Sequence, residues 1–325
     1  MSHSRLAIIP GDPNGIGPEL IAKLIDSGAV GKTPLRFVGD QHLFDLGTQQ
    51  AGLGGDFQAL VSSHQIDAQY DWLDTCRPGD VQLGQVTESG GRSTLRQIDH
   101  CLALCQSGAV PGYLFGPFNK AAMHMAGLGH DDELHYMADR LNFDGHVCEL
   151  NVMDRLFTSR VTSHIALKDV SANINPPEIL RAISLLDRTL KSAGNANPQI
   201  SVAALNPHAG DECNFGREEI DISATAVAEA RAQGFNVDGP WPSDTVFLKA
   251  KAGTTDAVVT MYHDQGQIEM KLMGFDRGVT IQGGLPYPVT TPAHGTAYDI
   301  AGQGAADVGA TRAAFELLRD LSRHS

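Results

Sequence analysis

The chain has 325 residues, of which 42% are hydrophobic and 19% charged, and its formal net charge is -14 at pH 7. This acidic balance argues against a nucleic-acid-binding protein, because neutralising phosphates requires clustered lysine and arginine. No apolar run approaches the ~18 residues of a membrane-spanning helix, and the N-terminus lacks the layout of a signal peptide. The sequence therefore predicts a cytoplasmic globular protein of two lobes, with no nucleic-acid or membrane partner.

Strand-like apolar runs alternate with helix-like segments along the chain, which is typical of a largely parallel sheet covered on both faces. In chain order, the expected strands are residues 5–9, 35–40, 112–116, 156–167, 199–206 and 256–262. The expected helices are residues 18–28, 93–108, 176–194 and 224–234. The pattern predicts an α/β fold.

Three histidines fall at or near the C-terminal ends of strand-like runs: His164, His208 and His263. In open α/β sheets, ligands bind in the crevice outside these strand ends. Three imidazoles that converge there can hold one divalent cation and leave positions open for substrate or water. A single histidine is more often a surface or core residue, but the joint placement of three favours a metal site. Asp264, next to His263, is a further candidate ligand or a residue that orients one.

Other polar residues stand next to the predicted strands and helices. Asn119 and Lys120 lie in a turn after the strand 112–116, and Asp244 precedes an apolar run. Lys271 follows His263 by eight residues. A lysine near a divalent cation has its protonated form disfavoured by like-charge repulsion, which suits it to proton transfer. An isolated lysine is more often a solvated surface charge, so this role depends on the family resemblance described next.

Six segments in order, spanning nearly the whole chain, resemble the 4-hydroxythreonine-4-phosphate dehydrogenase family. They are GDPNGIGPE, GPFNKAA, LNPHAGD with GREE, GPWPSDT, MYHDQG, and HGTAYDIAG. The opening segment is also similar to isopropylmalate and isocitrate dehydrogenases. The resemblance implies two α/β/α lobes, a homodimer, and an active site in the cleft between the lobes. We expect residues 1–128 plus 296–325 in the first lobe, and residues 129–295, with the metal histidines and the dimer interface, in the second.

The resemblance also implies an oxidative decarboxylation. NAD, or NADP, takes a hydride from a secondary alcohol, and the resulting β-keto acid loses carbon dioxide. The cofactor is expected near Asp12, Gly15, Asn119, Lys120 and Asn206. A divalent metal is expected on His164, His208 and His263, with zinc preferred over Mg, Mn, Co or Fe. Substrate contacts are expected from His130 and Lys271, and proton transfer from Lys271, Asp244 or Asp264. The glycine-rich GDPNGIGPEL lacks GxGxxG spacing and is interpreted as a strand-to-helix corner.

Three positions near the expected substrate depart from the family pattern. Asp131 stands where the family has threonine, Thr280 where it has asparagine, and Val289 where it has arginine. A lost arginine and a gained carboxylate change the local charge by about two units, and one charge pair at ~4 Å is worth roughly 4 kcal/mol. These departures favour a substrate without phosphate, a carboxylated aromatic cis-dihydrodiol of the terephthalate type that yields a catechol. Residues 281–295 are then expected to shape a pocket for the ring.

Alternatives remain open on the sequence alone. The first is 4-phosphohydroxy-L-threonine or a related phosphorylated hydroxy acid, with Arg92, Arg160 or Arg277 as compensating cations. A metal-dependent hydrolase also uses histidines and a bound water, and a non-catalytic binding protein can share the fold. A dehydrogenase produces NADH and stops on chelation, whereas a hydrolase needs no nicotinamide.

Overall fold

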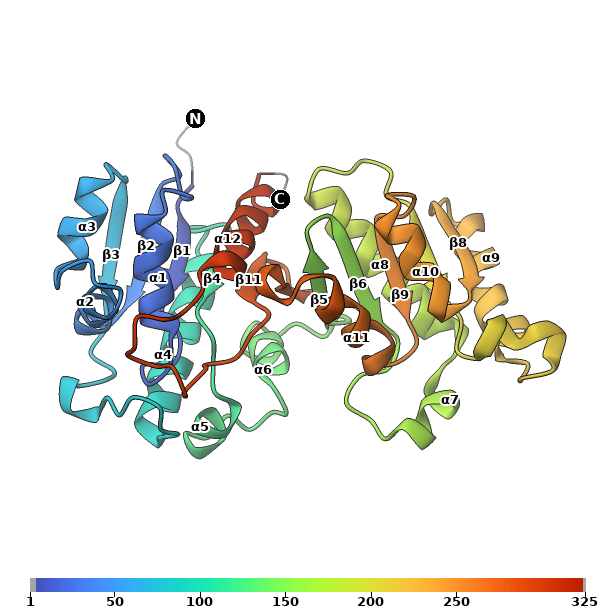
Figure 1. The fold of residues 1–325 in the computed structure, drawn as a ribbon, viewed down its shortest axis with the longest axis horizontal. Coiled ribbons are helices and arrows are strands. Elements are labelled where there is room, and N and C mark those ends of the chain that lie inside the picture. The colour runs from blue at the N-terminus through green and yellow to red at the C-terminus, as the bar shows by residue number, and fades with distance from the viewer. Residues whose placement is uncertain (1–3, 324–325) are drawn as a thin grey trace. The chain divides into compact units, whose positions relative to one another are not determined.

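The computed structural model describes residues 4–323, which form two compact units. The first unit comprises residues 4–147 and 279–323, and the second comprises residues 148–278. Both contain strands and helices in alternation, which confirms the predicted α/β class (Figure 1). The divisions at 147/148 and 278/279 differ from the expected 128/129 and 295/296. Residues 279–295 make their sheet contacts within the first unit, as described below.

The strands of the first unit lie in the order β3-β2-β1-β4-β11-β10. All neighbours are parallel except β10 and β11, which form an antiparallel hairpin. The strands are β1 (Leu6–Ile9), β2 (Leu35–Gly39), β3 (Ala68–Trp72), β4 (Tyr113–Phe115), β10 (Val279–Gly283) and β11 (Val289–Pro292). Since β11 pairs with β4, with Val289 opposite Tyr113, the hairpin belongs to this unit. The segment expected to shape a ring pocket is therefore largely a β-hairpin.

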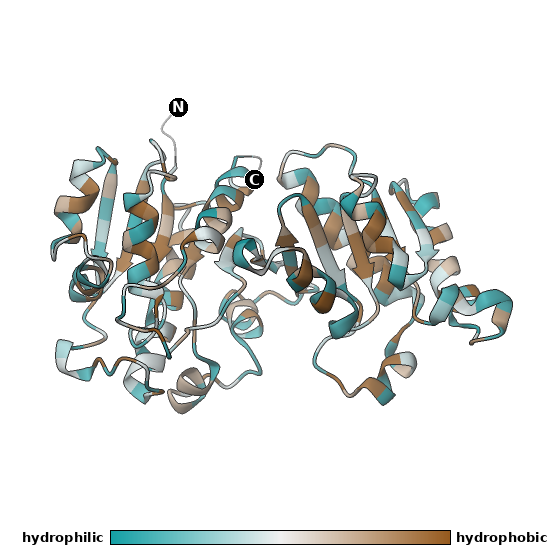
Figure 2. Ribbon diagram, viewed as in Figure 1, coloured by the Kyte–Doolittle hydropathy of each residue, from teal (hydrophilic) through white to brown (hydrophobic). Residues whose placement is uncertain are grey.

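The helices of the first unit turn apolar sides toward the core of this unit (Figure 2). They are α1 (Gly17–Asp26), α2 (Gln41–Gln50), α3 (Phe57–Ser63), α4 (Glu88–Gln106), α5 (Lys120–Met125), α6 (Glu133–Arg140) and α12 (Gly309–Leu321). The predicted helix 18–28 corresponds to α1, and the predicted helix 93–108 corresponds to α4. Pro18 suits the first turn of α1, where its missing N–H would have had no helical partner.

The glycine-rich corner after β1 packs against neighbouring backbone. A Cβ atom on Gly17 would lie 1.9 Å from the Pro10 carbonyl oxygen, and one on Gly11 would lie 2.4 Å from the Gly116 oxygen. Gly11 also has φ +81°, a conformation that favours glycine. Close approach of the backbone therefore explains these glycines, in agreement with their interpretation as a strand-to-helix corner.

Replacing Gly17 with alanine is expected to lower the free energy of unfolding by about 3 kcal/mol, because the new methyl group overpacks a site bounded by backbone. The matched control is Gly79→Ala, since a Cβ there meets nothing within 4 Å. Its effect should stay within about 0.5 kcal/mol. Urea denaturation of both variants measures the difference, and equal stabilities would contradict this account of the corner.

The second unit has the strand order β5-β6-β9-β7-β8. The β5–β6 pair is antiparallel and the other pairs are parallel. The strands are β5 (Cys148–Met153), β6 (Leu156–Arg160), β7 (Ile200–Ala203), β8 (Val237–Trp241) and β9 (Ala257–Thr260). The helices are α7 (Val170–Asn173), α8 (Pro176–Ser192), α9 (Ala224–Ala232), α10 (Ser243–Lys251) and α11 (His263–Gly274). Among residues 4–323, no helix is both long and apolar enough to cross a membrane.

Candidate functional site

The three predicted metal histidines follow three neighbouring parallel strands of the second unit. His164 follows β6, His263 follows β9, and His208 follows β7, and β9 lies between the other two strands. The prediction that they stand after the carboxyl ends of strands is confirmed. The carboxyl ends of parallel strands meet at one edge of a sheet, where α/β proteins place their ligands.

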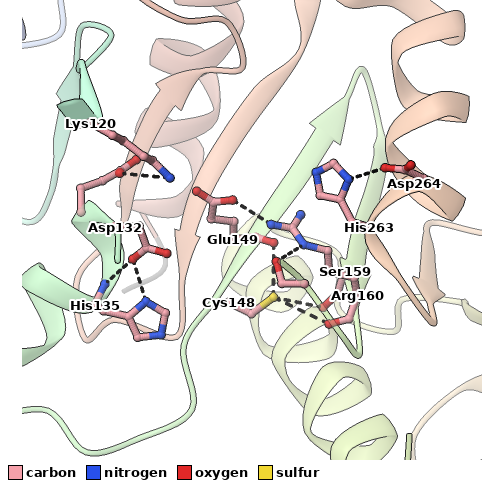
Figure 3. Close-up of polar contacts among 11 residues, drawn as sticks. Lys120, Asp132, His135, Cys148, Glu149, Ser159, Arg160, His263 and Asp264 are labelled. Atoms are coloured by element: carbon pink, nitrogen blue, oxygen red, sulfur yellow. Dashed lines mark hydrogen bonds and ion pairs between the residues drawn. The ribbon is translucent and has the colours of Figure 1, made fainter. Parts of the chain in front are cut away.

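Two of these histidines lie together. The ring centroids of His164 and His263 are 5.5 Å apart. The Nδ1 atom of His263 is 2.7 Å from Oδ1 of Asp264, a contact shown in Figure 3. A carboxylate on one ring nitrogen fixes the orientation and the tautomer of an imidazole and directs the other nitrogen toward a ligand. Asp264 is thus placed to orient His263, with Nε2 as the nitrogen that remains for binding.

His208 does not join this pair. Residues His208 to Cys213 all have positive φ, so the chain after β7 follows an irregular left-handed path. The ring of His208 lies 6.4 Å from that of Phe215. Within residues 4–323, no group of three or more histidine, cysteine, aspartate or glutamate side chains has the arrangement of a metal site. The described residues bring His164 and His263 together, and the site of all three histidines stays a prediction.

Arg160, at the end of β6, holds the segment that leads to His164. Its side chain is only 5% exposed, and its guanidinium is 2.8 Å from Oε2 of Glu149 (Figure 3). Its Nε donates a hydrogen bond of 2.8 Å to Oγ of Ser163, the residue before His164. A buried guanidinium that donates to two different partners fixes their geometry as well as neutralising charge. Arg160 is thus a positioning residue and is not available as a compensating phosphate ligand.

The other predicted residues of the second unit lie on its surface or make internal contacts. Asp244 is exposed in the first turn of α10, and Lys271 is exposed in α11, about two turns after His263. The side-chain amide of Asn206 donates to Glu218 at 2.8 Å and Glu219 at 3.0 Å. Asn206, a predicted cofactor contact, thus has its side-chain nitrogen hydrogen-bonded within the protein.

In the first unit, Asp12 and Gly15 are buried in the corner after β1. Asp12 accepts hydrogen bonds from the Tyr298 hydroxyl at 2.6 Å and from the backbone N–H of Asn14 at 2.9 Å. Burial raises the pKa of Asp12, and these hydrogen bonds offset the rise only in part. A Cβ on Gly15 would lie 2.9 Å from the backbone oxygen of Thr296. Both residues therefore join the corner to the segment around Thr296.

The raised pKa of Asp12 predicts a pH dependence of stability. The folded state holds the proton more tightly than the unfolded state, so the free energy of unfolding falls as pH rises through the folded pKa. The contribution is fully present below the ordinary aspartate range and is lost above the folded pKa. Asp12→Asn should remove this part of the slope, and Tyr298→Phe should move it to higher pH. Urea titrations across pH measure both, and an unchanged slope in Asp12→Asn would refute the assignment.

Asn119 and Lys120 stand at the start of α5. The Asn119 side chain accepts a hydrogen bond from the N–H of Ala122 at 2.9 Å, so it caps the helix. Nζ of Lys120 is 3.7 Å from Oε2 of the buried Glu133. Lys120 and Asp132 are drawn in Figure 3. The cap explains Asn119 structurally, whereas the exposed half of Lys120 remains accessible to a ligand.

His130 and Asp131 precede α6. Nε2 of His130 is 3.4 Å from Oδ2 of Asp139, and its ring packs edge-on against Tyr136 at 6.0 Å. Asp131 is exposed. The next residue, Asp132, caps α6 and accepts hydrogen bonds from the N–H and ring of His135 at 2.9 and 2.7 Å. Burial raises the pKa of Asp132, but these bonds outweigh it and leave the pKa lowered.

Thr280 and Val289, two predicted substrate contacts, lie in the β10–β11 hairpin and differ in their burial. Thr280 is half-buried in β10 opposite Thr291. Val289 is 0% exposed and packs in the hydrophobic core with Tyr113 and Phe115. Its assignment as a substrate-binding residue is wrong, because an apolar side chain sealed in the core contacts no substrate. The charge argument from a missing arginine therefore has no support at this position.

The chain has close relatives among known proteins. It is 49% identical over 333 residues to the putative 4-hydroxythreonine-4-phosphate dehydrogenase 2 of Pseudomonas aeruginosa, covering 99% of this chain and 98% of the relative. It is 34% identical over 330 residues to the D-threonate 4-phosphate dehydrogenase of Salmonella typhimurium, covering 99% and 100%.

Solved structures agree with these relatives. The crystal structure of 4-hydroxythreonine-4-phosphate dehydrogenase from Klebsiella pneumoniae matches with a TM-score of 0.84 and 34% identity, covering 99% of this chain and 98% of that one. A terephthalate 1,2-cis-dihydrodiol dehydrogenase from Burkholderia xenovorans matches with a TM-score of 0.67 and 24% identity, covering 98% of each. The second likeness concerns the fold alone.

These similarities place the chain in a class of two-unit α/β dehydrogenases. The model of the family described as pyridoxal phosphate biosynthetic protein PdxA matches residues 32–318. The chain belongs to the PdxA family, which confirms the resemblance inferred from its motifs.

Proposed function

We propose that the chain is an NAD-dependent dehydrogenase of a phosphorylated hydroxy acid, of the 4-phosphohydroxy-L-threonine or D-threonate 4-phosphate type. The observation that carries this proposal is the similarity over nearly the full chain to relatives that bear these names. It replaces the aromatic dihydrodiol as our preferred substrate class.

The positions of Val289 and Asp131 in the structure remove the argument for a dihydrodiol substrate. Val289 lies in the core, so an arginine missing there removes nothing from a substrate site. Asp131 is exposed beside His130, where its carboxylate is solvated and its effect on a nearby phosphate is weakened by screening. The dihydrodiol dehydrogenase from Burkholderia xenovorans shares only the fold. The phosphorylated alternative is thus the simpler proposal.

The proposed reaction removes a hydride from the carbon of a secondary alcohol and transfers it to NAD, while the hydroxyl proton passes to a protein base. Subsequent loss of carbon dioxide from the β-keto acid leaves an electron pair on carbon, which takes up a proton. Lys271, Asp244 and Asp264 are the proposed proton-transfer groups, and all three are accessible to solvent. His130 and Thr280 are proposed substrate contacts. We retain His164, His208 and His263 as proposed ligands of a divalent metal; of these, His164 and His263 lie together in the structure.

The test is a side-by-side assay of the purified protein with NAD or NADP and a divalent metal. The substrates are 4-phosphohydroxy-L-threonine, D-threonate 4-phosphate and terephthalate dihydrodiol, with NADH and released carbon dioxide as readouts. Turnover confined to a phosphorylated substrate is the expected result. Turnover of the dihydrodiol alone would overturn the proposal, and product formation without any nicotinamide would favour a hydrolase.

We also propose that the chain forms a homodimer through its second unit. Among the side chains described in that unit, eight large hydrophobic ones are exposed: Ile165, Leu167, Phe215, Ile220, Trp241, Leu248, Ile268 and Leu272. The first unit exposes only three among its described residues: Leu83, Val86 and Met125. Ile268 and Leu272 stand one turn apart on α11, so a second copy would cover them together. Sedimentation should give a dimer, and Ile268→Glu with Leu272→Glu should give a monomer; a monomeric wild type would refute this.

A further inference from the structure

A cavity in the first unit lies outside the carboxyl end of β3. Its volume is about 750 Å³, within the range of small-molecule sites. It is lined by Leu73, Asp74, Thr75, Arg77, Asp80, Arg92, Arg96, Asp99 and His100. The first five belong to the segment that follows β3, and the last four belong to one face of α4. Of the residues considered from the sequence, Arg92, a candidate phosphate cation, lines it, whereas the predicted metal, cofactor and catalytic residues do not.

Basic side chains form a column along one face of α4. Arg92, Arg96 and His100 are spaced four residues apart, which places them on successive turns of the same face. His100 already contacts Asp71 at 2.6 Å, so Arg92 and Arg96 are the like charges that face each other. Like charges at this spacing repel one another, so the arrangement destabilises the helix unless an anion lies between them. Arg77 lines the cavity from the segment after β3. The chain concentrates three of its 24 lysines and arginines here although its net charge is -14.

The guanidinium groups have little to neutralise them. Arg92 reaches Glu88 at 3.3 Å, but both side chains are more than half exposed, so the pair is weak. In the part of the chain that the structure describes, no carboxylate lies within ion-pair distance of Arg77 or Arg96. Guanidinium groups that lack partners in one cavity are suited to binding an oxyanion, because their donors match its oxygens in pairs.

The carboxylates of the cavity differ in their availability. Asp99 accepts hydrogen bonds from the Tyr136 hydroxyl and Nε of Arg140, each at 2.9 Å, so it does not neutralise the column. Asp74 and Asp80 are exposed on the opposite segment. Carboxylates in that position can accept hydrogen bonds from the hydroxyl groups of a ligand. The cavity thus combines donors for an oxyanion with acceptors for hydroxyls.

We propose that this cavity binds the phosphoryl group of a phosphate-bearing metabolite, with Arg92 and Arg96 as its principal ligands. The position outside a strand end agrees with where α/β folds hold ligands. The cavity is larger than a single phosphate needs, so the phosphate is either free or part of a nucleotide. The site goes beyond the proposed function, and it stands whether or not the substrate of the enzyme is phosphorylated.

The test is isothermal titration calorimetry on the full chain with inorganic phosphate and AMP as probes. Wild type should bind at least one of them, and Arg92→Gln with Arg96→Gln should weaken that binding by about tenfold or more. The matched control is Arg312→Gln, which removes an exposed arginine from α12 and should leave binding unchanged. Added salt should weaken the wild-type interaction, since a charge-based contact is screened.

The outcomes are distinct. Tighter binding of AMP than of phosphate supports a nucleotide, and equal binding supports free phosphate. The proposal is overturned if wild type binds neither probe, or if the double variant binds as wild type does. Because both arginines are exposed, the double variant should fold with an unchanged Tm, which the same samples can report. Binding is measured without turnover, so failure here is separate from failure of the proposed dehydrogenase activity.

Discussion

Replacing His263 with alanine should lower kcat/KM for NAD reduction by about 10²-fold or more, since residues that merely orient a ligand already contribute 10–100-fold. His263 lies beside His164 at the carboxyl end of β9, with its Nδ1 held by Asp264. Its side chain is 38% exposed, so its loss creates no cavity in the core and the fold should persist. NADH formation from the phosphorylated substrate and urea denaturation measure the two quantities separately.

Two further variants test whether the loss of activity is specific to His263. Asp264→Asn retains the size of the side chain but removes the charge that orients His263, so its loss should be smaller, about 10-fold. His124→Ala removes an exposed histidine from α5 and serves as the matched control, with activity close to wild type. If His263→Ala retained wild-type kcat/KM, the paired histidines would have no part in the reaction. Treatment with a chelator should reduce wild-type activity and leave little further loss in His263→Ala.

The strand-end position of the three histidines could be predicted from the sequence, because a parallel sheet brings the carboxyl ends of its strands to one edge. The path of the chain around His208 could not be predicted. Whether a side chain reaches its neighbours depends on the path of the chain after the strand, and residues 208–213 take positive φ angles that no hydrophobic pattern records. Strand ends thus identify candidates, whereas loop conformation decides which of them meet.

Val289 shows a second limit of the sequence. The resemblance to the family motif indicates that valine replaces an arginine there, but it does not indicate that the side chain packs in the core beside Tyr113. The same pairing of β11 with β4 assigns residues 279–295 to the first unit. Pairing between strands so distant along the chain depends on the whole sheet, so local periodicity could not predict it.

The three arginines of the cavity come from two different segments of the sequence: Arg77 precedes α4, whereas Arg92 and Arg96 belong to it. Arg92 and Arg96 occupy an i, i+4 spacing within a predicted helix, which was a usable signal of one shared face. Their meeting with Arg77 depends on the fold of the segment between β3 and α4. Of these three, the sequence indicates only Arg92 as a candidate cation for phosphate. The other two candidates, Arg160 and Arg277, instead contact Glu149 and Asp154.

Replacing Arg160 with alanine should lower the free energy of unfolding by about 3 kcal/mol, because it leaves the carboxylate of Glu149 largely buried without its partner. The matched control is Arg277→Ala in the same unit. Arg277 pairs with Asp154 at 3.0 Å, but both side chains are more than half exposed, so its loss should be below about 1 kcal/mol. Urea denaturation compares the two, and similar losses would show that burial of the first pair has no energetic consequence.

Arg160 also contacts Ser163, next to His164, so its replacement should affect catalysis as well as stability. Arg160→Met combined with Glu149→Leu removes both charges and should recover most of the stability, since paired replacement of a buried ion pair by apolar groups is often neutral. The same double variant still lacks the hydrogen bond to Ser163, so its kcat should stay about 10-fold below wild type. Recovery of both stability and kcat would mean that Arg160 only neutralises Glu149. Recovery of stability alone would establish that it positions the segment bearing His164.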